Sequence, residues 1–174
     1  MTVYLDATTL IALGSVDALD LLTVLDREVV ILERISNEVT TEPARTALRR
    51  FREEADLRSA TAVDENAIEQ AQTMLGEPER NGDVELVAGV LAHDDDDIAV
   101  VSDDQRVRTM ARTLGATVTG TVGIVVRAVA SGRLAAEEAK DLIRRLDSHG
   151  LHMTGELRER ADELIDDAAA DRES

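Results

Sequence analysis

The chain contains no cysteine and no tryptophan, and its only aromatic residues are Tyr4 and Phe51. Without cysteine it has no disulfide scaffold, no thiol nucleophile and no thiolate-ligated zinc or iron–sulfur site. With two aromatic rings it has no stacking platform for nucleic-acid bases. The core must therefore consist of aliphatic side chains, and the 44% content of hydrophobic residues is sufficient for one domain in 174 residues.

Long hydrophobic runs are also missing. No stretch approaches the roughly 20 uninterrupted apolar residues that cross a membrane. The first residues, Met1 to Asp6, carry no basic segment followed by an apolar one, which a signal peptide would have. From these two absences we expect a soluble, cytoplasmic protein that has no membrane partner.

Basic residues are scarce, because 19 arginine and lysine residues stand against 36 acidic ones and Lys140 is the single lysine. The net charge of −17 bears on solubility rather than on fold, and this composition suggests a halophilic source. Such a chain repels polyanions at ordinary salt. In molar salt the Debye length shrinks to about 3 Å, so local contacts decide whether a nucleic acid binds.

Short aliphatic strands alternate with helical segments through most of the chain. This alternation predicts an α/β fold, an α/β/α three-layer sandwich with a central parallel sheet. Pro43 suits the start of a helix, and Asp17 is expected to cap another. The predicted strands are 3–5, 29–32, 98–101 and 117–119. The predicted helices are 8–13, 19–25, 35–40, 44–55, 65–75, 83–92, 104–114 and 122–130.

Two further helices are predicted after this alternation, over residues 135–146 and 155–170. The second carries an apolar stripe at helical spacing, formed by Leu157, Ala161, Leu164, Ile165 and Ala168. We therefore expect a catalytic α/β domain over residues 1–133. A C-terminal helical extension over residues 134–174 would pack on the same domain or on a second subunit.

Acidic residues from separate parts of the chain are the candidates for chemistry. In an open α/β sheet, ligands bind beyond the carboxyl ends of the strands, and Asp6 and the pair Asp103-Asp104 follow two of the predicted strands. Glu38 lies on a short helix after a third strand, and Asp83 begins another helix. Convergence of these carboxylates would be unfavourable without a counterion. Mg²⁺ or Mn²⁺ would relieve this repulsion, since both ions accept oxygen ligands, and would support hydrolysis of a phosphodiester.

The segments around these acids resemble, in order and spacing, the four acidic blocks of PIN domains. They are Val3 to Thr8, Ile35 to Val39, Gly82 to Glu85 and Val101 to Asp104. The resemblance implies a metal-dependent endoribonuclease with RNA as substrate and Mg²⁺ or Mn²⁺ as cofactor. Its catalytic, metal-binding acids would be Asp6, Glu38, Asp83 and Asp104.

Hydroxyl residues accompany these acids. Thr8 matches the family's hydroxyl residue two positions after the first acid, where it would orient that carboxylate or a metal-bound water. Ser102 occupies a position where threonine is commoner in the family. Asp103 and Asp104 are adjacent and either could be the ligand, but the hydroxyl-x-Asp pattern favours Asp104.

Glu85 lies two residues after Asp83 and would face elsewhere on a helix, so we assign it a supporting role at most. The stretch from Gly120 to Gly123, together with the C-terminal helices, resembles toxin ribonucleases of the VapC type. This narrower resemblance implies a homodimer and a small antitoxin protein as partner. The two glycines could face a phosphate, although close packing is the simpler interpretation.

One locally basic stretch runs from Pro43 to Arg52, where Arg45, Arg49 and Arg52 share a helix face. A solvated helix face and a contact to an RNA backbone or an inhibitor both fit this pattern.

Two other clusters favour no metal site. The acids from Asp94 to Asp97 suit a solvated loop, because consecutive like charges repel and point in different directions. His149 and His152 flank Gly150, which indicates a helix end.

Other acidic-site enzymes do not fit. A haloacid-dehalogenase-like phosphatase needs a second aspartate where this chain has Thr8, and a response-regulator receiver needs a lysine after a late strand. A non-catalytic PIN-fold module that binds RNA or protein is the main alternative to a nuclease. Such a module would be expected to lack one or more of the four acids, and all are present.

Overall fold

The computed structural model describes residues 2–55, 57–60, 63–93 and 97–173. Five parallel strands form one sheet in the order β3-β2-β1-β4-β5 within this part of the chain. The strands are β1 (Thr2–Leu5), β2 (Glu28–Leu32), β3 (Arg58–Ala60), β4 (Ile98–Val101) and β5 (Thr117–Thr119). The predicted α/β class with a central parallel sheet is confirmed. The acidic run of residues 94–97 was predicted to form a solvated loop. Residues 94–96 of this run lie outside the described part of the chain.

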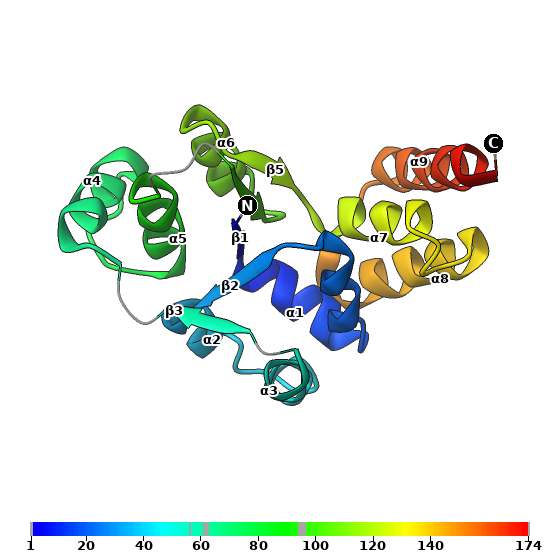
Figure 1. Cartoon of the computed structure of the whole chain (residues 1–174), viewed down its shortest axis with the longest axis horizontal. Coiled ribbons are helices and arrows are strands. Elements are labelled where there is room, and N and C mark those ends of the chain that lie inside the picture. The colour runs from blue at the N-terminus through cyan, green and yellow to red at the C-terminus, as the bar shows by residue number, and fades with distance from the viewer. Residues whose placement is uncertain (1, 56, 61–62, 94–96, 174) are drawn as a thin grey trace.

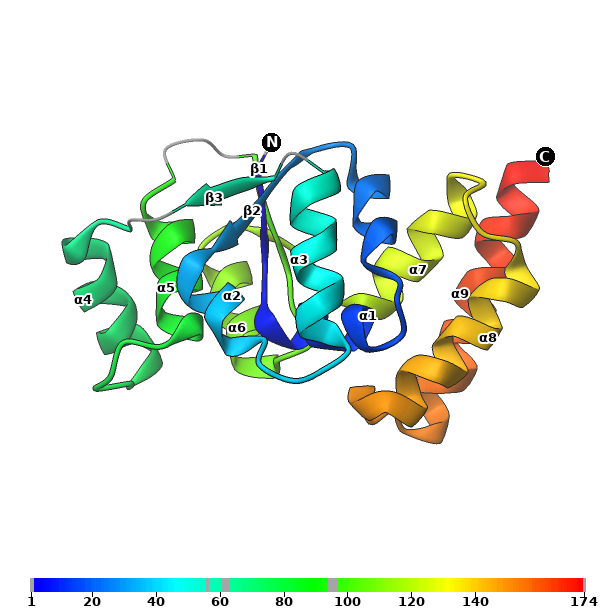
Figure 2. The same cartoon turned by 90° about the horizontal axis from the view of Figure 1, so that it is seen from below.

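Helices connect these strands and cover both faces of the sheet, as right-handed crossovers require. Helices α1 and α3 lie on one face, α5 and α6 lie on the other, and α4 packs on α5 (Figures 1 and 2). The short helix α2 follows β2 at the carboxyl edge. Their bounds are α1 (Ala7–Ser15), α2 (Glu33–Glu38), α3 (Ala44–Glu54), α4 (Glu65–Leu75), α5 (Gly82–Leu91) and α6 (Gln105–Thr113).

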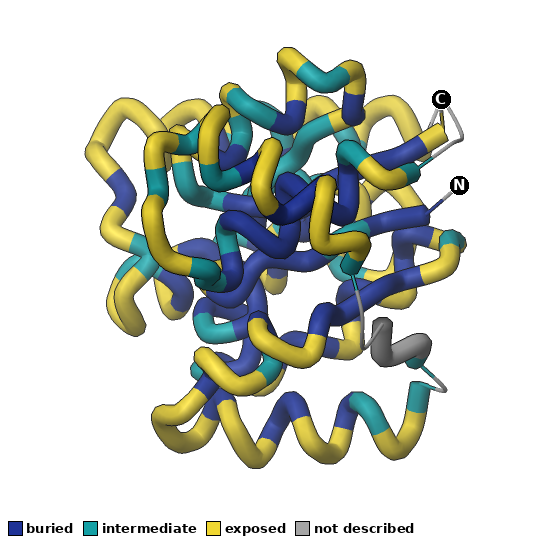
Figure 3. Tube along the Cα trace, turned by 90° about the vertical axis from the view of Figure 1, so that its left-hand side faces the viewer, coloured by how far each residue is buried: buried dark blue, intermediate teal, exposed yellow. Residues whose placement is uncertain are grey.

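The aliphatic strands form the centre of the molecule. β4 is buried along its whole length, and four of the five residues of β2 are buried. Strands covered on both faces are expected to be continuous runs of Val, Ile and Leu rather than alternating ones. The buried residues accordingly form the dark-blue centre of the burial view, with exposed helical turns outside them (Figure 3).

Two sequence-based predictions were wrong in this region. The edge strand β3 was not predicted, because it is only three residues long and has no aliphatic run. It is defined by its parallel pairing with β2, from Val30 with Arg58 to Leu32 with Ala60. Asp17 was predicted to cap the segment from Leu19 to Leu25, which is a 3-10 helix, η1, preceded by Ala18. Asp17 instead has a left-handed backbone with φ 56° and pairs with an arginine on α3.

The chain ends in a group of helices beyond one side of the sheet (Figures 1 and 2). They are α7 (Thr121–Ala130), α8 (Ala136–Leu146), the π-helical turn η2 (Asp147–Leu151) and α9 (Gly155–Glu173). Helix α7 packs against both α8 and α9 and also against η1. Residues of α8 and α9, including Ile143, Leu146 and Ile165, belong to the same buried cluster as the strands. No helix of the described chain is both long and apolar enough to span a bilayer.

Only part of the apolar stripe predicted on the last helix is buried. Ala161 and Ile165 are fully buried, Leu164 and Ala168 are partly buried, and Leu157 is 46% exposed. The predicted helix end before α9 is present, because Gly150 has a φ of 111° and breaks the helical backbone.

The buried and exposed residues of α9 should contribute differently to the stability of the fold. Ile165→Ala should lower the free energy of unfolding by about 2–4 kcal/mol, because it removes buried methyl groups and leaves a cavity. The matched variant Leu157→Ala should change it by less than about 1 kcal/mol. Urea unfolding followed by circular dichroism measures both. Equal effects of the two variants would contradict the packing of α9 on α7.

Candidate functional site

Asp6 is the best-held acid at the carboxyl edge of the sheet. It directly follows β1, its backbone N–H donates to the carbonyl oxygen of Val101 at 3.0 Å, and the residue is 3% exposed. Its Oδ2 atom accepts hydrogen bonds from the hydroxyls of Thr8 at 2.7 Å and Ser102 at 2.6 Å. Both donors use one oxygen, so the carboxylate is fixed in orientation while Oδ1 receives no bond from the described residues.

Ser102 connects Asp6 to the acid that begins α6. Its hydroxyl donates to Asp6 and accepts the backbone N–H of Asp104 at 3.0 Å. Asp104 caps α6 through Oδ1, which accepts the N–H of Val107 at 2.9 Å. A single buried hydroxyl therefore fixes the acids that follow β1 and β4, whose strands are neighbours in the sheet.

Glu38 lies at the end of α2 and faces α5. Its Oε1 atom accepts the backbone N–H of Gly82 at 2.8 Å. A Cβ atom at position 82 would come within 2.7 Å of both carboxylate oxygens of Glu38. Glycine at this position therefore leaves room for the Glu38 carboxylate, which a larger residue would displace.

The pKa of Asp83 depends on its burial and on the other three acids. Burial is the main cause that raises its pKa from 3.8 to about 6, and repulsion by Asp6, Asp104 and Glu38 raises it further. Arg106 acts in the opposite direction. The structure thus brings the four predicted acids, from β1, α2, α5 and α6, within electrostatic reach of one another.

The donor set suits a hard divalent cation, although the acids do not surround a common point as they stand. Within the described ranges, no three acidic or histidine side chains form a group that could hold a metal ion. The acids nevertheless supply only oxygen ligands, which is the chemistry that Mg²⁺ and Mn²⁺ accept. Asp6, Glu38 and Asp104 each use one carboxylate oxygen in bonds to the chain, and the other remains for a ligand.

The adjacent acids Asp103 and Asp104 have different surroundings. Asp103 caps α7, because its Oδ1 accepts the N–H of Thr121 at 2.9 Å and its Oδ2 accepts the hydroxyl of the same residue. It is not among the charges that raise the pKa of Asp83. The geometry therefore places Asp104, rather than Asp103, with the other acids.

The glycines before and within α7 allow close packing. A Cβ atom on Gly120 would lie 2.6 Å from Oδ1 of Asp103, and one on Gly123 would lie 2.0 Å from the hydroxyl of Thr119. This agrees with the packing interpretation of these two residues.

Glu85 is buried and faces away from the four acids. Its Oε1 atom accepts hydrogen bonds from Nε of Arg34 at 3.0 Å and Nε of Arg80 at 2.7 Å. Arg34 lies on α2 and Glu85 on α5, so this pairing ties together the helices that carry Glu38 and Asp83. The supporting role predicted for Glu85 thus has a structural basis in the position of α2.

Sequence reasoning did not single out three arginines near the acids, namely Arg34, Arg80 and Arg106. Arg106 donates to Glu77 at 2.9 Å and to the carbonyl oxygen of Leu75 at 3.0 Å, and it is the cation that lowers the pKa of Asp83. The available signal was its place in the first turn of the helix that follows Asp104. Arg34 offered no such signal, because its partner Glu85 is 51 residues away, and Arg80 lies in a loop five residues before Glu85, outside any predicted helix.

The predicted basic residues Arg45, Arg49 and Arg52 line one groove of about 390 Å³ between α2 and α3. Arg45 pairs with Glu42 at 2.8 Å, and Arg52 donates to the hydroxyl of Ser36 at 2.7 Å. The groove is completed by Ser36, Val39, Leu48 and Glu53.

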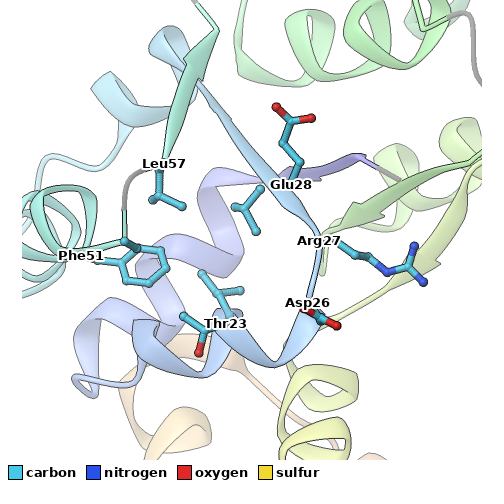
Figure 4. Close-up of a pocket in the computed structure, with 9 residues that line it drawn as sticks. Thr23, Asp26, Arg27, Glu28, Phe51 and Leu57 are labelled. Carbon is cyan, nitrogen blue, oxygen red and sulfur yellow. The ribbon is translucent and has the colours of Figure 1, made fainter.

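Another cavity, of about 560 Å³, lies at the opposite end of β2 from the acids (Figure 4). Glu28, the first residue of β2, lines it together with Thr23, Arg27, Phe51 and Leu57. None of the predicted site residues is among its lining residues. The acids and this cavity are therefore separate features of the molecule.

These features define a class of protein, a parallel α/β domain with an acidic site at the carboxyl edge of its sheet. Residues 2–167 match the sequence family described as DUF3368, a PIN domain, and the chain belongs to this family. Comparisons with curated proteins and with solved structures returned no match. PIN domains are typically nucleases and typically use divalent metals such as Mg²⁺ or Mn²⁺.

The raised pKa of Asp83 predicts a pH dependence of folding when no divalent ion is present. A carboxyl with a pKa of about 6 when folded and 3.8 otherwise binds its proton more tightly in the folded chain. Its stabilising contribution is therefore present at low pH and is lost as the pH rises through this window. In EDTA near pH 8, Asp83→Asn should be more stable than the wild type by about 1 kcal/mol, allowing for solvent screening.

This advantage should disappear below about pH 4, where the wild-type carboxyl is protonated in both states. The midpoint of urea unfolding at several pH values provides the measurement. Asp167→Asn, at an exposed position on α9, is the control for the change in net charge. Equal stabilisation by both variants would show that repulsion within the site is not the cause.

The ion pairs of Glu85 predict a loss of stability when its carboxylate is removed. Glu85→Ala leaves Arg34 and Arg80 without their shared buried partner and should cost about 1–3 kcal/mol. Glu65 also pairs with Arg80, but its side chain is 78% exposed, so Glu65→Ala should cost no more than about 1 kcal/mol. Thermal or urea unfolding would compare the two. A cost that is no larger for Glu85→Ala would contradict its role in holding α2 against α5.

Proposed function

We propose that the protein is a metal-dependent endoribonuclease that hydrolyses phosphodiester bonds of RNA. The observation that carries this proposal is the gathering of four carboxylates, from β1, α2, α5 and α6, at one edge of the sheet. Burial of Asp83 and, to a smaller extent, repulsion by the other three acids raise its pKa, so its ionised form is unfavourable for folding. An acidic cluster that serves only stability would not be expected to contain uncompensated like charges.

Asp6, Glu38, Asp83 and Asp104 would hold Mg²⁺ or Mn²⁺. When bound, the ion activates water, positions the scissile phosphate and neutralises charge on the leaving oxygen. The chain itself holds the acids in place. Thr8 and Ser102 orient the Asp6 carboxylate, and Gly82 orients that of Glu38. The substrate class follows from the PIN family rather than from a base-reading surface, since the chain has only two aromatic residues.

Further assignments rest on the resemblance, the composition and the helix–strand pattern described above. We propose that the enzyme is a VapC-like toxin, neutralised by a small antitoxin, that it forms a homodimer, and that it acts in the cytoplasm of a halophilic organism. We also propose a catalytic domain over residues 1–133 with a helical extension over residues 134–174. The shared core of α8 and α9 with the strands supports packing of the extension on the same domain.

The proposed activity predicts cleavage of RNA by the purified protein in high salt with Mn²⁺ or Mg²⁺, and none in EDTA. Asp6→Asn should reduce the rate by more than roughly 100-fold, because it removes the charge of a proposed ligand. Ser102→Ala keeps all four acids but loses the hydroxyl that orients two of them, so a reduction of about 10- to 100-fold is expected. Gel analysis of the RNA fragments over time measures these rates.

Asp20→Asn, at an exposed position on η1, serves as the matched control and should cleave at the wild-type rate. Equal cleavage by wild type and Asp6→Asn would trace the activity to a contaminating ribonuclease. RNA binding without cleavage, under every metal condition, would support the alternative of a non-catalytic PIN-fold module.

A further inference from the structure

The short helix α2 separates the acidic site from the arginine-lined groove. It lies between α3 and α5 in both views of the fold (Figures 1 and 2). On one side, Glu38 of α2 accepts the backbone N–H of Gly82 on α5. On the other side, Ser36 of α2 accepts a hydrogen bond from Arg52 of α3. Residues two apart do not face the same side of a helix, so α2 contacts the acidic site with one side and the groove with another.

The groove concentrates positive charge in a strongly acidic chain. Arg45, Arg49 and Arg52 line it, whereas Glu53 is its only acidic lining residue and Glu42 pairs with Arg45 at its edge. Elsewhere many basic side chains pair with acids, as Arg34 does with Glu85 and Arg106 with Glu77. The groove thus differs from most of the described surface in the sign of its charge.

Two of the three guanidinium groups in the groove have partners within the chain, and the third is available to a ligand. Glu42 holds Arg45, and the hydroxyl of Ser36 holds Arg52. Arg49 lies between them on α3, is exposed, and has no hydrogen-bond or ion-pair partner among the residues that the structure describes. Guanidinium groups arranged in this way match phosphate oxygens, to which arginine donates two parallel hydrogen bonds.

We propose that this groove binds the sugar-phosphate backbone of the RNA strand whose scissile bond lies at the acids. The inference rests on the proposed nuclease function and adds the surface that holds the substrate. RNA is the occupant that we assign, because its phosphates complement the charge of the three arginines and because α2 connects the groove to the proposed cleavage site. Contact through the backbone also agrees with the lack of aromatic stacking residues.

The test measures RNA binding separately from cleavage. Fluorescence anisotropy of a short, unstructured, labelled RNA in EDTA gives its affinity at salt concentrations from roughly 0.1 to 1 M, where repulsion by the acidic chain is increasingly screened. Arg49→Glu should weaken binding by about 10-fold at the lowest salt and should reduce the slope of log affinity against log salt by about 0.7 for each lost phosphate contact. Arg49→Lys keeps the charge and should restore part of the affinity.

Arg112→Glu is the matched control. Arg112 is an exposed arginine on α6 that also has no hydrogen-bond or ion-pair partner in the described chain, so its reversal makes the same change in net charge. Its affinity for RNA should stay within about twofold of the wild type. Circular dichroism and urea unfolding should show that both variants remain folded, since each side chain is exposed.

Equal affinities of wild type and Arg49→Glu, or the absence of RNA binding by the wild type, would overturn the inference. With RNA excluded, the groove would be a site for an acidic protein partner. Asp6-dependent cleavage of RNA, together with normal RNA binding by Arg49→Glu, would contradict the assignment of the groove. The same result would support the proposed nuclease function. Loss of RNA affinity in Arg49→Glu, together with no cleavage by the wild type, would support the groove as an RNA-binding surface. It would contradict the proposed nuclease function.

Discussion

Repulsion between carboxylates at one edge of the sheet is the constraint that the structure must satisfy. The fold responds by fixing the carboxylates rather than by neutralising them. The hydroxyls of Thr8 and Ser102 hold Asp6, and a backbone N–H holds Glu38. Asp83 has no such donor among the described residues, and its burial, together with repulsion by the other acids, raises its pKa. The site is thus oriented by hydrogen bonds but retains its negative charge, which is the condition in which it would attract a dication.

The cations around these acids are engaged with other partners. Arg34 and Arg80 pair with Glu85, and Arg106 pairs with Glu77. These pairs connect neighbouring elements without placing a guanidinium group among the four acids. Arginine can therefore stabilise the positions of α2, α5 and α6 while the negative potential between them persists. The groove on α3 differs from this region, because its arginines Arg45 and Arg49 are exposed to solvent.

Local sequence signals predicted most elements correctly because those elements depend on local physics. Buried parallel strands require aliphatic runs, and the runs at 29–32 and 98–101 lie within β2 and β4. The predicted strand at 117–119 is β5, an edge strand of sequence Thr-Val-Thr with β-branched residues only. The strand β3 escaped prediction because an edge strand of three residues has no such run and exists through pairing with β2. Asp17 was misassigned because a capping residue type says nothing about an ion pair with Arg50, 33 residues away.

The sequence alone determined which acids follow strands and begin helices, and hence that Asp6, Glu38, Asp83 and Asp104 were candidates for one site. The strand and helix settings of these acids follow from local periodicity, and the resemblance to the four acidic blocks of PIN domains singled them out among the 36 acidic residues. Only the tertiary structure separated Asp103 from Asp104, buried Glu85 between two arginines and placed the groove one helix away from the acids. Each of these depends on contacts between distant segments, such as Asp103 with Thr121 and Glu38 with Gly82. The sequence specifies which side chains the chain carries, whereas the packing of distant segments decides which of them are in contact.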